Sequence, residues 1–421
     1  MHFFKSLSIY TLTSLLNAAI PFLLLPILTH YLSVEAYGLL TIMQIFILFT
    51  FPFVSLNVHS TLQLEYHTLD QDAFSLWVSS VLVIPLGMVL MVLGFFILFQ
   101  GLFFHFMETS LIWLLLVPLI ALMQVVPQTL LSIYRISERP LNYAKYQLSL
   151  TGLNLLLTLI LVVLLQLNWE GRVLAIFITY LLFSLVGLYL LVRLGLLRWA
   201  ISWEYVKRAI EMGAPLILHV VSAALFMMSD RLFISYYLGN EALGLYAVGA
   251  QIAMIAMIVQ ESFNQAWVPY LFSNLKTGLR ENQIKIVKIS YGAILFFAFL
   301  PFLIWLMTPL LFQLFVDAKF MDAIAYVFWI ALGYGFLGMY KVVTNYIFYE
   351  KRVKLLSIMS FLSLLLNLLM NYWLIHRFGA IGVAYGTVIT LAIFFLVAFV
   401  VANHVHKMPW LFFISTEEKG R

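Results

Sequence analysis

The sequence predicts an all-α, polytopic membrane protein with twelve transmembrane helices in two repeated six-helix bundles. Three observations lead to this fold class. Of the 421 residues, 64% are hydrophobic and only 10% are charged, which is more apolar surface than a soluble domain can bury. Apolar runs of about 20 residues, long enough to cross a bilayer, recur along the whole chain. A motif near the start of the chain also returns in its second half.

Each apolar run is expected to form one membrane-spanning helix. The first run follows the N-terminus without a small-residue cleavage site, so it is expected to be a helix and not a cleaved signal. The first six helices are expected at 7–29, 38–58, 74–99, 111–133, 148–167 and 173–192. The second six are expected at 213–238, 245–268, 289–311, 323–346, 355–375 and 381–402.

The basic residues predict the orientation of these helices. If the N-terminus is cytoplasmic, 18 of the 23 Lys and Arg residues fall in cytoplasmic segments. Outer loops then hold Arg172, Lys319 and Arg377, and the spans hold Arg231 and Lys341. Cytoplasmic loops of membrane proteins carry an excess of Lys and Arg, so both termini are expected in the cytoplasm. Because the basic residues lie in short loops, the net charge of +5 does not indicate a nucleic-acid partner.

An internal repeat divides the chain into related halves. The segment YLSVEAYGL at 31–39 matches YLGNEALGL at 237–245, and Asn154 falls on Asn367 after one gap. Six helices are an even number, so the halves are expected to share one orientation, like the parallel repeats of some transporters. The expected domains are a lobe at 1–192, a basic cytoplasmic linker at 193–211, a second lobe at 212–402 and a cytoplasmic tail at 403–421.

Polar residues form stripes on several of the expected helices. Residues three, four and seven apart share a helix face, and such a face should avoid lipid. Any single Ser or Thr could simply bond a neighbouring helix. Matched stripes in both halves instead predict a shared polar cavity between the halves, with Asn17, Asn154, Asn345 and Asn367 among its walls. The main stripes contain Tyr10, Thr13 and Asn17; Gln147, Thr151, Asn154 and Thr158; Gln124 and Gln128; and Ser360, Asn367 and Asn371.

Four charged residues fall within the expected spans, all of them in the second half: Asp230, Arg231, Glu261 and Lys341. Successive residues on a helix lie about 100° apart, so Asp230 and Arg231 are expected to point in different directions. His219 shares a face with Asp230. Salt bridges, or snorkelling of Arg231 and Lys341 to the membrane surfaces, remain the structural alternatives to a functional role.

Several chemistries have no motif in the sequence. There is no phosphate-cradling glycine loop with its lysine, no serine nucleophile elbow and no zinc-ligand spacing, and cysteine is absent. The outer loops are too short for a large external catalytic domain. The sequence therefore predicts that the protein is not an enzyme and needs no cofactor or metal.

Three stretches carry a resemblance to a known family: SLSIYTLTSLLNAAIPFLLLPILTHYLSVEAYGLLTIMQ at the start, SDRLFISYYLGNEALGLYAVGAQI in the second half, and QESFNQAWVPYLF. They resemble the bacterial polysaccharide flippases, the Wzx-like O-antigen and oligosaccharide transporters of the MATE-like MOP superfamily. The resemblance covers essentially the whole chain. It implies a MATE-like fold in the bacterial inner membrane. It also implies transport of undecaprenyl-diphosphate-linked oligosaccharide from the inner to the outer leaflet by alternating access.

The resemblance suggests roles for the charged residues in the expected spans. An anionic diphosphate needs cations in the cavity, and Arg231 and Lys341 are the only candidates that the expected spans supply. Arg231 is expected to draw the diphosphate outward, and Asp230, packed with His219, to take a proton in the cycle. Glu261 is a second coupling candidate. The implied partners are the lipid-linked oligosaccharide, membrane lipids, a polysaccharide polymerase and a chain-length regulator.

Two other functions remain open at the level of the sequence. A multidrug or cation exporter of the same superfamily would need acidic residues without cations in its cavity. A non-transporting membrane scaffold for polysaccharide assembly would tolerate the loss of every charge within the spans.

Overall fold

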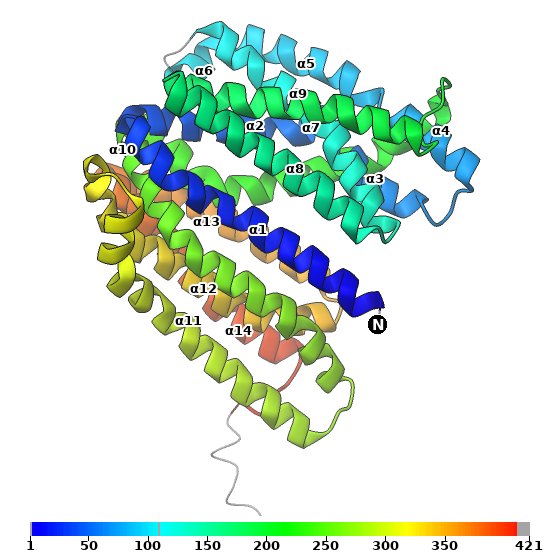
Figure 1. The fold of residues 1–421 in the computed structure, drawn as a ribbon. Helices are drawn as coiled ribbons and strands as arrows, with labels where there is room; N and C mark the ends of the chain where they lie inside the picture. The colour runs from blue at the N-terminus through cyan, green and yellow to red at the C-terminus, as the bar shows by residue number, and fades with distance from the viewer. Residues whose placement is uncertain (1, 108–109, 411–421) are drawn as a thin grey trace, which may run out of the picture. The chain divides into compact units, whose positions relative to one another are not determined.

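The computed structural model of the protein describes residues 2–107 and 110–410, which are helical almost throughout (Figure 1). Its first half contains α1 His2–Tyr31, α2 Val34–Ser55, α3 Val58–Glu65, α4 Gln71–Val81, α5 Ile84–Leu98, α6 Gln100–Met107, α7 Leu111–Ile136, α8 Pro140–Thr158, the π-helix η1 Leu159–Leu164 and α9 Asn168–Arg193. Its second half contains α10 Trp203–Leu275, α11 Arg280–Phe315, the 3-10 helix η2 Ala318–Ala323, α12 Ile324–Tyr349, α13 Val353–Phe378 and α14 Ala380–Val405.

The described helices confirm the prediction of an all-α, multi-pass membrane protein. Eleven helical stretches among the described residues are long and apolar enough to cross a membrane. One of them, α10, has 73 residues, far more than the roughly 20 that one crossing needs. It is interrupted at Gly239, whose φ of 85° and ψ of 178° lie outside the helical region and are accessible essentially only to glycine. The number of twelve crossings stays a prediction.

Two of the expected helices differ in outline from the prediction. The helix expected at 74–99 is divided, because α4 ends at Val81 and α5 begins at Ile84. Pro85 lies in the first turn of α5, and a proline cannot continue the hydrogen bonding of a preceding helix. The helix expected at 148–167 begins earlier, at Pro140, and its last turns form the π-helix η1. Proline is favoured at the first position of a helix.

The chain forms two compact units. Unit 1 comprises the residues up to Met228 together with Gly239–Gly244, and unit 2 comprises Ser229–Leu238 and the residues from Leu245 onward. All three boundaries therefore lie within α10. The expected domain limits at 192 and 211 stay a prediction, but the helical part of the expected linker begins at Trp203, where α10 starts.

The core of unit 1 is centred on Trp77 of α4, whose side chain is fully buried. It packs against Tyr205, with ring centroids 5.3 Å apart, and lies under the guanidinium of Arg208. The segment that leads into α10 is also fixed to α4, since the backbone N–H groups of Arg198 and Ser202 donate to the hydroxyls of Ser79 and Ser80. The start of α10 is thus an integral part of unit 1.

The two copies of the repeated motif approach each other closely within unit 1. A Cβ atom on Gly38 would lie 1.8 Å from the backbone oxygen of Asn240, and one on Gly244 would lie 2.0 Å from that of Val34. Only glycine permits such an approach of two backbones. The conserved spacing of these glycines in the two copies of the motif is therefore explained by a reciprocal backbone contact.

In unit 2, α12 packs against both α11 and α14, and α13 packs along α14. The interior contains Phe297 of α11 and Tyr346 of α12, both fully buried. The Tyr346 hydroxyl is paired with Ser290 of α11 at 2.9 Å. This pairing satisfies the polar end of a buried aromatic side chain, as burial requires.

We expect Gly38→Ala to lower the thermal stability of the detergent-purified protein. The added methyl group would force the backbone at Asn240 to move, and overpacking of this kind costs about 1–3 kcal/mol. Gly87→Ala is the matched control, because a Cβ atom at Gly87 of α5 meets nothing within 4 Å. The measurement is the melting temperature of both variants beside the wild type. Equal melting temperatures would contradict the close contact.

Candidate functional site

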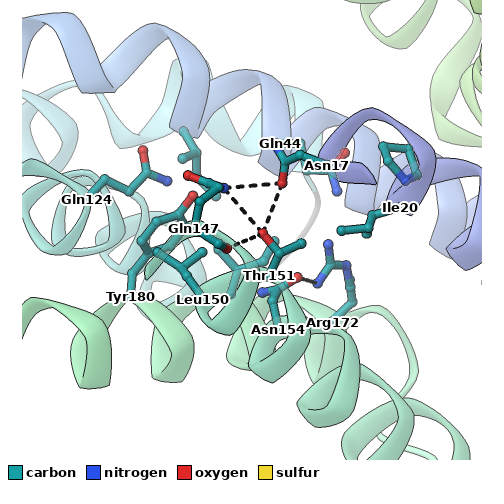
Figure 2. Close-up of a pocket in the computed structure, with 13 residues that line it drawn as sticks. Asn17, Ile20, Gln44, Gln124, Gln147, Leu150, Thr151, Asn154, Arg172 and Tyr180 are labelled. Carbon is teal, nitrogen blue, oxygen red and sulfur yellow. Dashed lines mark hydrogen bonds between the residues drawn. The ribbon is translucent and has the colours of Figure 1, made fainter. Parts of the chain in front are cut away.

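Unit 1 contains a polar pocket of about 350 Å³ that lies among five helices (Figure 2). Polar side chains reach it from α1, α2, α7, α8 and α9, near the middle of most of these helices. The residues that line it are Asn17, Ile20, Pro21, Gln44, Ile47, Gln124, Gln147, Leu150, Thr151, Asn154, Arg172, Ile176 and Tyr180. None of these lining residues is acidic.

One wall of the pocket is a hydrogen-bonded group on α1 and α8. The Gln147 amide donates to Asn17 Oδ1 at 3.2 Å, and the Thr151 hydroxyl lies 2.9 Å from the same oxygen (Figure 2). Gln147 and Thr151 can meet one acceptor because residues four apart share a helix face. The polar stripes predicted on α1 and α8 therefore meet, and Asn17 Oδ1 of α1 is the atom that both α8 side chains contact.

Gln44 and Gln124 supply the opposite polar groups of the pocket, from α2 and α7. Their side chains make no hydrogen bond to any part of the protein that the structure describes. A primary amide carries two donor hydrogens and a carbonyl acceptor. These two side chains can therefore bond a polar ligand without first giving up a protein partner.

The pocket also contains a buried arginine, Arg172 of α9, which is 8% exposed. Its Nη1 donates to Asn154 Oδ1 at 2.6 Å (Figure 2). The same nitrogen donates to the Thr158 hydroxyl at 2.9 Å. Asn154 and Thr158 again lie four residues apart, on the face of α8 turned to α9. The amide of Asn154 in turn donates to Thr179 of α9 at 3.4 Å. The direction of the guanidinium is thus set by neutral acceptors.

The charge of Arg172 is not neutralised by the protein. No acidic side chain within the described ranges forms an ion pair with it, and its buried Nε has no hydrogen-bond partner there. Removing an ion from water costs several kcal/mol even after relaxation, unless a partner compensates. The pocket therefore has a net positive charge.

The sequence-based placement of Arg172 in an outer loop was wrong. The apolar run begins at residue 173, but α9 begins at Asn168, so that Arg172 belongs to the second turn of the helix. Averaging hydropathy over a window underestimates the length of a helix whose first turn is polar. The available signal was the stripe of Asn154 and Thr158 on α8, whose acceptors needed a donor from a neighbouring helix.

In unit 2, Asp230 and Arg231 form a closed pair, which contradicts the expectation that they point in different directions. The Arg231 Nη1 lies 3.0 Å from Asp230 Oδ1, and both residues are buried. The carboxylate folds back to accept the Arg231 backbone N–H at 2.8 Å, and the long arginine side chain spans the angle between the two positions. The Tyr246 hydroxyl donates to the other carboxylate oxygen. Arg231 is therefore neutralised, unlike Arg172.

The remaining charged candidates of unit 2 also form a pair. Lys341 of α12 forms a salt bridge with Glu261 of α10, and both side chains are partly exposed. Asn345, one turn from Lys341, donates to the side-chain oxygen of Asn264 at 2.8 Å. These residues form one polar cluster within unit 2.

Asn367 of α13 lies in a closed hydrogen-bond network and is only 1% exposed. It accepts from Ser229 at 2.8 Å and from Asn371 at 3.1 Å, and it donates to Thr387 of α14 at 3.4 Å. The side chain of His219 lies outside the described residues. The cavity expected between the two halves stays a prediction, since the described pocket lies within unit 1.

Comparison with known proteins agrees with this architecture. A family described as "Polysaccharide biosynthesis protein" matches residues 3–275. An "Uncharacterized membrane protein" of Haemophilus influenzae is 29% identical over 379 residues, which cover 87% of this chain and 89% of the relative.

Solved structures show the same fold at low sequence identity. An inward-facing multidrug resistance MATE family transporter of the MOP superfamily has a TM-score of 0.70 and 16% identity, covering 93% of this chain and 94% of its own. The lipid II flippase MurJ in an inward closed conformation has a TM-score of 0.69 and 13% identity, covering 94% and 87%. The MATE-like fold expected from the sequence is thus confirmed.

We expect Asp230→Asn and Arg231→Gln, each alone, to lower the thermal stability of the protein strongly. Each leaves the opposite charge buried without its partner, which costs about 3–5 kcal/mol. The double substitution should recover much of the loss, because no unpaired charge remains. Arg198→Gln is the control, since its pair with Asp72 is exposed and such pairs contribute about 0–1 kcal/mol. Melting temperatures that fall equally for Arg198→Gln and the single variants would argue against the pair.

Proposed function

The chain belongs to the polysaccharide biosynthesis protein family, and from this premise we propose that it is a flippase for undecaprenyl-diphosphate-linked oligosaccharide. The oligosaccharide, an O-antigen or other surface polysaccharide unit, would move from the inner to the outer leaflet by alternating access. The site of this activity is the bacterial inner membrane, with both termini in the cytoplasm, as the distribution of Lys and Arg favours. Membrane lipids, a polymerase and a chain-length regulator belong to the same proposal.

The observation that carries the proposal is the chemistry of the pocket in unit 1. Its walls supply amides from Asn17, Gln44, Gln124, Gln147 and Asn154, and hydroxyls from Thr151 and Tyr180. A sugar presents hydroxyl groups at every face, so it needs such donors and acceptors once it leaves water. A lipid tail needs none of them. The pocket therefore suits the head of a glycolipid.

The charge of the pocket disfavours a multidrug or cation exporter. A cationic ligand needs acidic groups, and none of the lining residues is acidic. The buried Arg172 would also repel a cation in a medium of low dielectric constant. An anionic glycolipid is attracted by the same charge. An inside-negative membrane potential further favours outward movement of an anion, by roughly 2.3 kcal/mol per charge per 100 mV.

A non-transporting scaffold is the second alternative, and the pocket again argues against it. A scaffold acts through its outer surface and gains nothing from an unneutralised charge inside a helical bundle. Solved structures that share the fold include a multidrug resistance MATE family transporter and the lipid II flippase MurJ. The role of an enzyme is not proposed, because the described pocket has the character of a binding site and carries no acid or nucleophile with an adjacent base.

Transport should be measurable with the purified protein in liposomes. Fluorescent undecaprenyl-diphosphate oligosaccharide is placed in one leaflet, and its exposure to an impermeant quencher is followed over time. We expect the protein to accelerate exchange over empty liposomes, and an imposed potential to bias the direction. A lipid-linked fluorophore without glycan is the control for non-specific scrambling. Absence of exchange with correctly folded protein would contradict the flippase proposal.

We expect Gln124→Leu and Gln44→Leu to slow this transport by about 2–10-fold each. The substitution keeps the side-chain volume but removes one hydrogen-bonding group, which is worth about 0.5–1.5 kcal/mol. Gln313→Leu, an exposed position on α11 of unit 2, is the matched control and should transport like the wild type. The measurement is the initial rate of exchange in the same liposomes. Unchanged rates for both pocket variants would separate the pocket from transport.

A further inference from the structure

Arg172 has bonding capacity that the protein does not use. Its two hydrogen bonds both involve Nη1, with Asn154 and Thr158 as acceptors. The Nε is buried and has no partner within the described residues. A guanidinium carries five donor hydrogens in a planar fork. Nη2 makes none of these bonds, so its hydrogens are free to donate to a ligand in the pocket that Arg172 lines.

We propose that Arg172 is an oxyanion-binding subsite, which takes a phosphate or carboxylate group of the transported glycolipid at Nη2 of its guanidinium. The inference rests on the proposed function and deepens it by naming the residue and the group that it recognises. Planar, two-point recognition of phosphate and carboxylate oxygens is the chemistry for which arginine is best suited.

The neighbours of Arg172 position it without competing for the ligand. The Thr158 hydroxyl lies 2.6 Å from the backbone oxygen of Asn154, to which it donates, and this leaves its lone pairs for Arg172. Asn154 is fixed in turn by its bond to Thr179. Asn154 and Thr158 are both neutral, so they orient the guanidinium and leave its charge intact. They act as positioning residues.

The surroundings of the subsite indicate what the anion is attached to. Gln44, Gln124 and Gln147 line the same pocket and offer amide groups to a neutral, hydroxyl-rich moiety. The volume of about 350 Å³ accommodates a sugar-sized group beside the anion. The oxyanion can come from two sources, the diphosphate that links glycan to lipid or the carboxylate of an acidic sugar. Both present oxygens of the same geometry.

The test is a binding measurement on the purified full chain in nanodiscs with three probes. The first is a short-chain prenyl-diphosphate disaccharide of neutral sugars, the second an alkyl glucuronide, and the third a neutral alkyl glucoside. We expect Arg172→Gln to weaken binding of at least one anionic probe about tenfold or more, because a charge-assisted hydrogen bond is lost. Binding of the neutral glucoside should stay unchanged. Arg377→Gln, an exposed arginine of α13, is the control and should bind all probes like the wild type.

A second variant keeps the test meaningful if Arg172→Gln fails to fold. Asn154→Asp places a carboxylate where the amide oxygen now lies 2.6 Å from Nη1, so that the guanidinium is kept but neutralised. It should lose anionic binding to a similar extent while retaining or raising the melting temperature. Arg172→Lys keeps the charge without the planar fork and should give an intermediate affinity.

The pattern of results separates the two sources and the two proposals. Loss confined to the prenyl diphosphate identifies the linking diphosphate, and loss confined to the glucuronide identifies an acidic sugar. Anionic affinity that is unchanged in both variants, or no anionic binding by the wild type, overturns the subsite. Equal liposome transport by the wild type and both variants would support the flippase proposal but not the Arg172 subsite. Arginine-dependent binding without wild-type transport would preserve the subsite and remove the flippase.

Discussion

A bilayer offers no water to a buried polar group, and this constraint accounts for most of the polar contacts in the protein. A polar side chain within the apolar helices needs a hydrogen-bond partner on its own helix or on another, or else a cavity that holds water or ligand. In unit 2, Asp230 and Asn367 meet the requirement with partners in the protein. Asp230 is satisfied by Arg231 and Tyr246, and Asn367 by its three neighbours. Unit 1 meets it by leaving a pocket in which Arg172 retains an unused donor.

The internal repeat makes this contrast informative. In each unit an asparagine on one helix donates to a threonine on the next, at 3.4 Å in both: Asn154 with Thr179, and Asn367 with Thr387. The same local geometry then has two outcomes. Ser229 approaches the asparagine of unit 2 and completes a neutral network, whereas Arg172 approaches that of unit 1 and brings a charge. The equivalent asparagines of the two units thus have different surroundings, a neutral network in unit 2 and a charged arginine beside a pocket in unit 1.

The sequence predicted the fold class because the hydropathy of long apolar runs leaves few alternatives, and it placed Asn17 and Asn154 correctly on polar helix faces. Arg172 was missed because a charged residue near the end of a helix cannot be distinguished by hydropathy from a residue of the adjoining loop. The sequence could not predict whether the side chains of a polar stripe bond other protein groups or face a pocket. The partner of such a side chain can lie far away in the sequence, as Ser229 and Asn367 do at 138 residues apart. The Asp230–Arg231 contact depends on side-chain torsions, which helix periodicity does not describe.

The adjacency of Asp230 and Arg231 has a consequence for biosynthesis. A pair between neighbouring residues of one helix requires no second helix, so it can form as soon as this segment is synthesised and coils. The segment can then enter the bilayer as a neutral unit, before its later partner Tyr246 has left the ribosome. The Glu261–Lys341 pair joins two helices that are made at different times, so it cannot form until the second of them has been synthesised.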